Sequence, residues 1–407
     1  MRIKLFRISR LHQPVPFVFW ALAVGLLINF LPILLPFLRA LPVSFLGWAL
    51  PLIACAAYFL LRPRRFAFPL LIWLPWFLWL FIYLLLAEAD NAFQRTVMML
   101  TPLLMGVVFS TVTMTGERWQ LCRRWLYIFV GIYLAASLLS WGSGAAGVIT
   151  ASLLACWLAA NYGFYRRPGD LVLWGLMALV PVISVTRMGI LAVGITLPAT
   201  LAPLPRLRRV WLVVAMLLTG LTVFQMPSVQ EKMFLSGEGT LEQAFESGAA
   251  MLIGADRLDS NFRTNARAAM ARELRSRVQQ AYWFGHGANA VEEVTVRYFN
   301  GLTHPHNDWL RLQHDYGTLG MWLFAFTLLA QAAHAWRVSR RLQGEAKVMM
   351  VAAVSAFLPM VMFMLTDNVI LYVAWFGNLH FAMLGLAYSA MRTQKRQAAF
   401  AGAPATR

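Results

Sequence analysis

Between residues 16 and 391, long apolar runs alternate with short polar turns. A bilayer-spanning helix needs roughly 20 mostly apolar residues, and most of these runs approach that length. The pattern predicts twelve transmembrane helices, near residues 16–38, 43–61, 67–88, 94–114, 124–141, 144–163, 171–186, 188–204, 210–226, 318–336, 347–366 and 369–391. The pair at 171–204 depends on a division at Arg187 and could instead form one long or broken helix.

The polar turns alternate in charge. If the N-terminus is cytoplasmic, every turn on that side is rich in Lys and Arg, at residues 62–65, 117–124, 165–170, 205–209, 337–347 and after 391. The opposite turns at 39–42, 90–95 and 140–145 carry one basic residue or none. Basic loops resist translocation, so this bias orients the helices. We therefore predict twelve spans in residues 1–226 and 318–391, with both chain ends inside.

One polar segment, residues 227–317, is too long to be a simple turn. It carries nine basic and eleven acidic residues, for a net charge of −2, whereas the rest of the chain carries +20. Four of the seven histidines lie in it, namely His286, His304, His306 and His314. Structureless loops of this length are unusual, so we expect a folded, functional loop outside the cytoplasm. Helix-forming residues predict one helix at 261–281.

Composition supports a membrane protein and restricts the kinds of partner that we expect it to bind. Hydrophobic residues make up 60% of the chain, against about 45–50% in soluble domains. The net charge of +18 could suggest nucleic acid, but the basic residues lie in short loops rather than on one soluble patch. We expect membrane lipids and no nucleic acid as partners. The three cysteines lack metal-site spacing and are expected to be small hydrophobes.

Both ends of the chain are basic. The first residues resemble the start of a signal peptide, but the following run at 16–38 is too long and lacks a clean cleavage site, so we expect a retained first helix. Residues 392–407 are interpreted as a basic cytoplasmic tail near anionic headgroups.

Arg187 interrupts an apolar stretch of more than 30 residues in the sequence ISVTRMG. An arginine at membrane depth is costly, and it usually has a function or a partner. The predicted topology puts Arg187 at the outer end of a helix pair, where its planar fork suits a phosphate. The alternative is a side chain that extends to the interface without any catalytic task.

A second candidate site is the run THPHNDWLRLQHDYGTLG at residues 303–320. His304 and His306 flank a proline and are followed by Asn307. Histidine titrates near neutral pH, which suits a general base. A metal site is a weaker alternative, because the pair lacks further ligands at a typical spacing. A histidine that merely caps the next helix is a third.

Arginines recur along the predicted loop helix. Arg263 and Arg267 are four residues apart and would share a face that could hold a second anionic group. For Arg272, Arg275 and Arg277 we expect a solvated face with Glu273 as a partner.

Together these motifs resemble the O-antigen ligase family, within the group that includes O-antigen polymerases and bacterial O-oligosaccharyltransferases. The resemblance covers about residues 184–320: the T-R-x-G arginine, the long loop, and H-P-H-N-x-x-L before a helix that reaches G-x-x-G. His306 takes the place of the family histidine, with Leu310 in register and His304 upstream. Residues 284–287 (FGHG) fit the family's turn loosely, because Tyr282 and Trp283 replace its proline.

The resemblance implies a GT-C-like, all-α integral membrane glycosyltransferase in the bacterial inner membrane, with its site facing the periplasm. The donor would be a glycan on undecaprenyl pyrophosphate, and the acceptor a sugar hydroxyl of lipid A–core oligosaccharide. Catalysis would use His306 as the base and Arg187 and Arg263 at the leaving group. His304, Asn307 and Arg267 would bind substrate. Neither a metal nor another cofactor would be required.

Three other functions stay open. An O-antigen polymerase would join repeat units, and a protein O-oligosaccharyltransferase would modify protein, although that enzyme usually has a longer C-terminal soluble part. A transporter of anionic lipids would also use membrane arginines, but it would more often show internal repeats and a short external loop.

Overall fold

A computed structural model describes residues 17–28, 30–35, 37, 43–61, 65–139, 145–201, 203–253, 259–264, 267–299 and 304–401. In this part of the chain the structure consists of helices and turns, with an isolated antiparallel β-bridge between Phe234 and Phe262. The predicted helical class of membrane protein is therefore confirmed.

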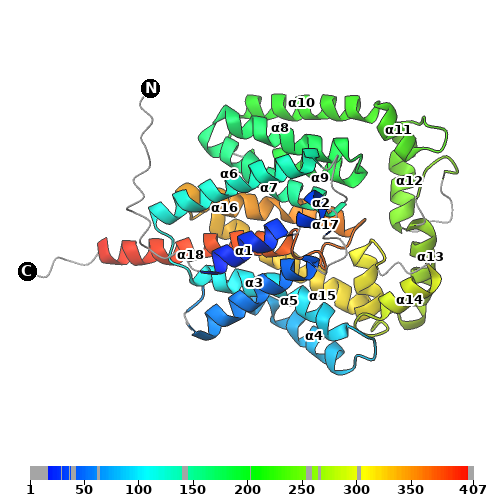
Figure 1. Cartoon of the computed structure of the whole chain (residues 1–407), viewed down its shortest axis with the longest axis horizontal. Coiled ribbons are helices and arrows are strands. Elements are labelled where there is room, and N and C mark those ends of the chain that lie inside the picture. The colour runs from blue at the N-terminus through cyan, green and yellow to red at the C-terminus, as the bar shows by residue number, and fades with distance from the viewer. Residues whose placement is uncertain are drawn as a thin grey trace, which may run out of the picture.

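The predicted spans coincide with apolar helices (Figure 1). Before the polar segment these helices are α1 (Phe17–Ile28), α2 (Leu31–Leu34), α3 (Val43–Leu61), η3 (Leu70–Trp73), α4 (Leu74–Leu85), α5 (Ala92–Thr111), α6 (Gly116–Leu139), α7 (Ala145–Tyr165), α8 (Pro168–Ile183), α9 (Arg187–Thr200) and α10 (Arg206–Phe224). After it they are α15 (Asp308–Ser339), α16 (Gly344–Ser355), α17 (Phe357–Met364) and α18 (Gly377–Ala401).

By length and composition, six helical segments can cross a membrane: Ala92–Thr111, Gly116–Leu139, Gly147–Tyr165, Arg206–Phe224, Asp308–Ser339 and Gly344–Met364. Five shorter apolar helices occupy other predicted spans. The structure thus supports a multi-pass protein, whereas the number twelve and the GT-C likeness stay predictions. The predicted division near Arg187 is present, because α8 ends at Ile183 and α9 begins at Arg187.

One of the two late helix starts is confirmed and the other is wrong. The helix expected at 318 does begin there, because the non-helical backbone of Gly317 divides α15. A further helical segment from Asp308 precedes it, and the Asn307 side chain caps that segment by accepting from the Leu310 amide at 3.0 Å. The helix expected at 369 begins only at Gly377. Its first residues are turns, since the Asp308 carboxylate accepts the Ile370 amide at 3.0 Å.

The bundle is built around α7. Within the spanning window of α7, 89% of the residues are buried, against 6% for α10 at the edge. Helices α8, α9 and α16 pack around α7, and α5 pairs with α18. Small residues such as Ala151, Ala155 and Ala159 on α7 allow this close approach.

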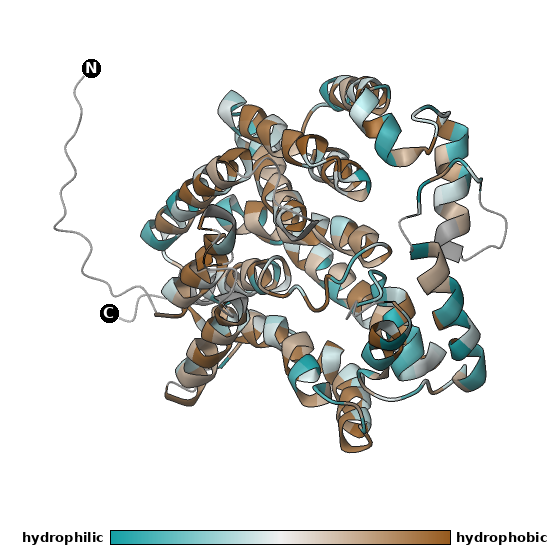
Figure 2. Cartoon of the chain, turned by 45° about the vertical axis from the view of Figure 1, so that its right-hand side comes forward, coloured by the Kyte–Doolittle hydropathy of each residue, from teal (hydrophilic) through white to brown (hydrophobic). Residues whose placement is uncertain are grey.

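The polar segment folds as an arch beside the bundle, as Figures 1 and 2 show. It contains α11 (Pro227–Met233), α12 (Leu241–Ile253), α13 (Arg267–Val278), η4 (Gln279–Ala281) and α14 (Ala290–Tyr298). In Figure 2 the bundle is mainly brown, and hydrophilic teal is concentrated toward the arch. A small core of Leu274, Val278, Val291 and Leu310 packs α13 and α14 against the start of α15. The predicted folding of this segment is confirmed.

Candidate active site

His306 lies just before α15 and faces the turns that follow α17. Its Nδ1 atom is 3.4 Å from Asp367 Oδ1 and 3.2 Å from Asn368 Nδ2. Its side chain is 32% exposed, whereas that of Asp367 is 5% exposed. The backbone of His306 has φ = 50°, an unusual left-handed conformation that the surrounding contacts must maintain. We call His306, Asp367 and Asn368 the histidine corner.

Next to this corner is a network centred on Glu292 of α14. The Glu292 carboxylate lies 2.8 Å from Arg95 Nε, 3.3 Å from His304 Nδ1 and 3.8 Å from Arg311 Nη1. Asn289 completes this glutamate network by donating to Glu292 at 3.1 Å. It joins α5, α14 and α15, so it ties the arch to the bundle.

The groups of the glutamate network shift the pKa values of one another. Burial alone raises the pKa of Glu292, but His304, Arg95 and Asn289 outweigh that effect and hold its pKa at about 2. Burial lowers the pKa of His304, and the positive charge of Arg311 adds to this, although the bond to Glu292 opposes both. His304 therefore favours its neutral form and is already engaged with its neighbours.

Two glycines lock the loop before α14 onto α15. Gly317 (φ = 73°) interrupts α15, and the freed amides of Thr318 and Leu319 donate to the carbonyls of Tyr282 and Trp283 at 2.9 and 3.3 Å. A Cβ on Gly317 would lie 2.1 Å from the Trp283 carbonyl oxygen. A Cβ on Gly285 (φ = 72°) would lie 2.4 Å from the Gly317 nitrogen. These contacts explain why glycine is needed at both positions.

Arg187 is the first residue of α9 and lies against the other end of the arch. Its Nη2 donates to the Arg263 carbonyl at 3.1 Å, and its guanidinium lies over the Phe262 ring at 5.1 Å. Residues 233–235 and 261–263 pair there as extended backbone. Arg263 therefore precedes α13 rather than sharing a helix face with Arg267, so that prediction is wrong.

The neighbouring cations bond to main-chain oxygens. Arg263 Nε donates to the Phe234 carbonyl at 3.2 Å, and Lys232 Nζ donates to the Ser184 carbonyl at 3.4 Å. Arg267, at the start of α13, is near enough for its charge to repel that of Arg187. We call Arg187, Lys232, Arg263 and Arg267 the basic cluster. Within the described ranges, none of the four forms a salt bridge with a carboxylate.

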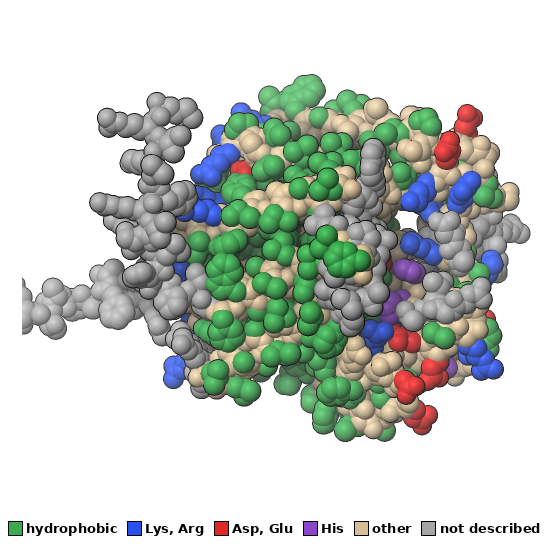
Figure 3. All heavy atoms as spheres, in the orientation of Figure 1, with side chains coloured by type: hydrophobic (Ala, Val, Ile, Leu, Met, Phe, Trp, Pro, Cys, Tyr) green, Lys and Arg blue, Asp and Glu red, His purple; other side chains and the backbone are tan. Residues whose placement is uncertain are grey.

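Figure 3 shows a hollow on the right-hand side of the molecule, between the arch and the bundle. Lys and Arg side chains border it from above, and His side chains lie at its lower edge with Arg, Asp and Glu side chains beside them. The basic cluster and the histidine corner come from the elements on these two sides.

The predicted site residues divide between the two sides. His304, His306 and Asn307 lie together before α15, whereas Arg187, Arg263 and Arg267 lie together at the arch. Sequence reasoning missed Lys232 and Asp367. Asp367 stands in an apolar stretch, and an acidic residue in such a stretch is a signal that could have identified it. In the part of the chain described, no three His, Cys, Asp or Glu side chains gather as a metal site.

Among the remaining arginines, Arg277 has the expected partner, since its Nε lies 2.8 Å from Glu273. This pair follows the i, i+4 spacing of an outward helix face. Arg277 therefore differs from the arginines of the basic cluster, because it is paired with a carboxylate.

The fold and the site define a class: a helical membrane protein whose folded polar arch brings several cations and a histidine to the edge of the bundle. Residues 172–325 match the family model described as O-antigen ligase. This match confirms the resemblance over the central part of the chain. It includes all six predicted site residues, whereas Asp367 lies beyond it. A comparison with curated proteins found no match.

Proposed function

We propose that this protein is a glycosyltransferase that ligates O-antigen polysaccharide from undecaprenyl pyrophosphate to a sugar hydroxyl of lipid A–core. It would act in the inner membrane at the periplasmic leaflet. The main support is the basic cluster, in which Arg187, Lys232 and Arg263 bond to carbonyl oxygens and have no carboxylate partner among the described residues. Such a group of cations at the edge of the bundle suits a lipid pyrophosphate.

Leaving-group stabilisation is assigned to Arg187 and Arg263. As the bond between the anomeric carbon and the pyrophosphate oxygen breaks, negative charge grows on the pyrophosphate. Cations placed beforehand stabilise that charge most strongly where water is scarce. The start of α9 adds its backbone amides to the charge of Arg187. Lys232 and Arg267 would bind the donor through its charge.

Proton transfer is assigned to His306. The acceptor hydroxyl forms a new bond to the anomeric carbon and gives its proton to His306. Asp367 and Asn368 both approach Nδ1, so Nε2 would face the acceptor. Asp367 would then orient the ring and stabilise the imidazolium, in the manner of the carboxylate in a catalytic triad. Undecaprenyl pyrophosphate leaves, and the step requires no metal.

His304 and Asn307 have a less direct part in this proposal. His304 belongs to the glutamate network, and the Asn307 side chain caps α15. Both would act as positioning residues that fix the orientation of His306. Any contact with substrate would use polar atoms of these side chains that are not already hydrogen-bonded.

The test is a reaction of purified protein with a lipid-linked glycan and lipid A–core. Ligation predicts an increase in acceptor mass equal to that of the transferred glycan. Longer glycans still attached to lipid would instead indicate a polymerase, and a glycosylated periplasmic protein would indicate an oligosaccharyltransferase. Movement of intact donor across vesicles without any transfer would indicate a transporter and overturn the proposal.

A further inference from the structure

A second feature lies in the bundle, and none of the residues that line it belongs to the site described above. A cavity of about 120 Å³ runs between α1 and α6, with α18 beneath it. Its floor includes Leu22, Phe109 and Met383, which are buried, and its rim includes Trp20 and Trp125, which are 48% and 40% exposed. The cavity is therefore a groove that opens to the surroundings of the bundle.

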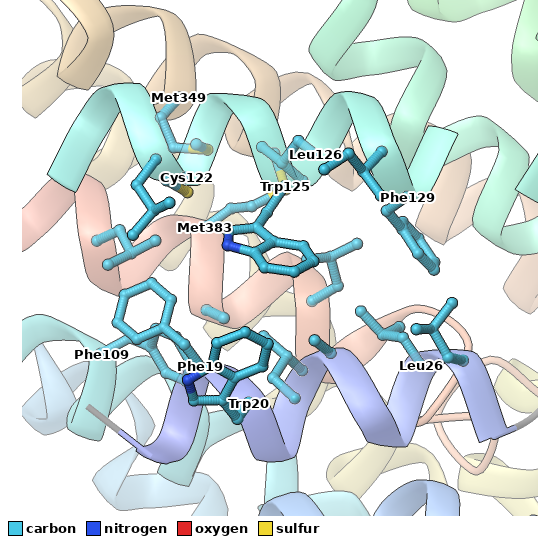
Figure 4. A pocket seen from close by; sticks show the side chains of 18 of the residues that line it. Phe19, Trp20, Leu26, Phe109, Cys122, Trp125, Leu126, Phe129, Met349 and Met383 are labelled. Atoms are coloured by element: carbon cyan, nitrogen blue, oxygen red, sulfur yellow. The ribbon is translucent and has the colours of Figure 1, made fainter. Parts of the chain in front are cut away.

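Aromatic side chains define the shape of this groove. Figure 4 shows Trp20 on α1 and Trp125 on α6 facing each other across it, and their ring centroids are 5.1 Å apart. At the far end, Phe129 meets Phe30 at 6.3 Å. The lining on α6 extends from Arg118 to Ile132, which is about 21 Å at 1.5 Å per residue. That length exceeds the hydrocarbon depth of one leaflet, roughly 15 Å, so the groove is long enough for an acyl chain of that leaflet.

A groove of this kind in a membrane is filled by lipid, because an empty apolar channel forfeits dispersion contacts along its walls. The question is which lipid. Of the described residues that line it, Arg118 is the one that carries a charge. Arg118 Nη1 donates to the Thr113 carbonyl at 2.7 Å. A guanidinium has five N–H donors, so this bond leaves others for a phosphate.

We infer that the groove is a binding site for one anionic diacyl phospholipid. One acyl chain lies between α1 and α6 beneath the tryptophan pair, and the phosphate rests on Arg118. The charge bias of the loops puts the Arg118 end at the cytoplasmic leaflet, where anionic lipids attract basic residues. The site is independent of the glycosyltransferase proposal, so either can fail without the other.

The test uses two variants with matched controls. Arg118→Gln removes the phosphate contact, and Arg208→Gln removes an exposed arginine at the start of α10. Ala23→Phe fills the groove, and Ala215→Phe adds the same bulk on the exposed face of α10. Each protein is purified in mild detergent, its retained lipids are quantified by mass spectrometry, and its melting temperature is measured with added phosphatidylglycerol or phosphatidylethanolamine.

The inference predicts about one retained phosphatidylglycerol per wild-type chain and a melting-temperature rise with phosphatidylglycerol alone. Both groove variants should retain at least fivefold less, and both controls should behave as wild type. Equal retention of phosphatidylethanolamine, retention of a polyprenyl phosphate instead, or unchanged retention in Arg118→Gln would overturn it. Arg118 is half-buried at the rim, so its variant remains informative if Ala23→Phe does not fold.

Discussion

The basic cluster and the glutamate network both contain more than one arginine, yet these arginines have different partners. In the network, Arg95 and Arg311 both lie within 4 Å of one carboxylate, Glu292. In the basic cluster, Arg187 and Arg263 donate to carbonyl oxygens. The arginines of the first arrangement have a carboxylate partner, whereas those of the second have none among the described residues.

Under the proposed function, this difference separates cations with a structural role from cations that bind substrate. The glutamate network joins the arch to the bundle, and its arginines already have a carboxylate partner. The like charges of the basic cluster repel one another, and binding of a polyanion would relieve that repulsion. The histidine corner lies beside the first region, and the proposed reaction requires that it act on a substrate held by the second.

The largest loss of turnover is expected from His306→Ala. Loss of a general base usually slows a reaction 10²–10⁴-fold, so less than about a tenth of the wild-type turnover should remain. The protein should still purify as a folded membrane protein, because the side chain is partly exposed. His304→Ala is the matched comparison and should reduce turnover less. Reversal of that order would assign the base to His304.

The next largest effect is expected from Arg187→Lys. An ammonium group does not reproduce two planar donors facing a pyrophosphate, so turnover should fall roughly 10²-fold. Arg277→Lys is the control, since Arg277 is paired with Glu273 on α13. Nearly normal turnover in Arg187→Lys would indicate that Arg187 extends to the membrane interface without contacting the pyrophosphate.

A smaller effect is expected from Asp367→Asn. The variant keeps the shape of the histidine corner and removes its charge, so His306 would be oriented less well. Turnover should fall roughly tenfold to a hundredfold. Wild-type turnover in this variant would mean that Asp367 supports only the turn after α17.

The smallest effect on turnover is expected from Glu292→Gln, which should instead lower the thermal stability of the protein. The pKa of Glu292 falls from 4.5 to about 2 on folding, so its carboxylate stabilises the protein fully above pH 4.5 and loses that contribution as pH falls toward 2. The contribution is about 3 kcal/mol. The variant should melt earlier at pH 7, and the difference should shrink in acid. Equal melting temperatures at pH 7 would contradict a structural network.

Hydropathy alone predicted where the apolar helices lie, because a long apolar run in a membrane has few alternatives to a helix. It could not predict the helical segment before Gly317 or the late start at Gly377. The segment before Gly317 contains Arg311, His314 and Asp315, which suggest an exposed loop, yet these side chains are buried. Residues after 368 continue as an apolar run, but the Asp308 carboxylate accepts the Ile370 amide and so stabilises turns there instead of a helix.

The candidate site was partly predictable for a similar reason. Motifs at Arg187 and His306 are local and stand out in the sequence. Asp367 is 61 positions from His306, and Lys232 is 48 positions from Ser184, so only the fold brings these pairs together. Pairs at such distances depend on the packing of the arch and cannot be deduced from local pattern.

The most direct test of the account compares donor affinity and turnover for Arg187→Lys and His306→Ala in the same purified preparation. The basic cluster is assigned to donor binding and the histidine corner to proton transfer. Arg187→Lys should therefore bind the lipid-linked pyrophosphate donor at least tenfold more weakly, whereas His306→Ala should bind it within about twofold of wild type and fail to turn it over. Equal losses of donor affinity in both variants, or a normal affinity in Arg187→Lys, would contradict the division of roles between the two regions.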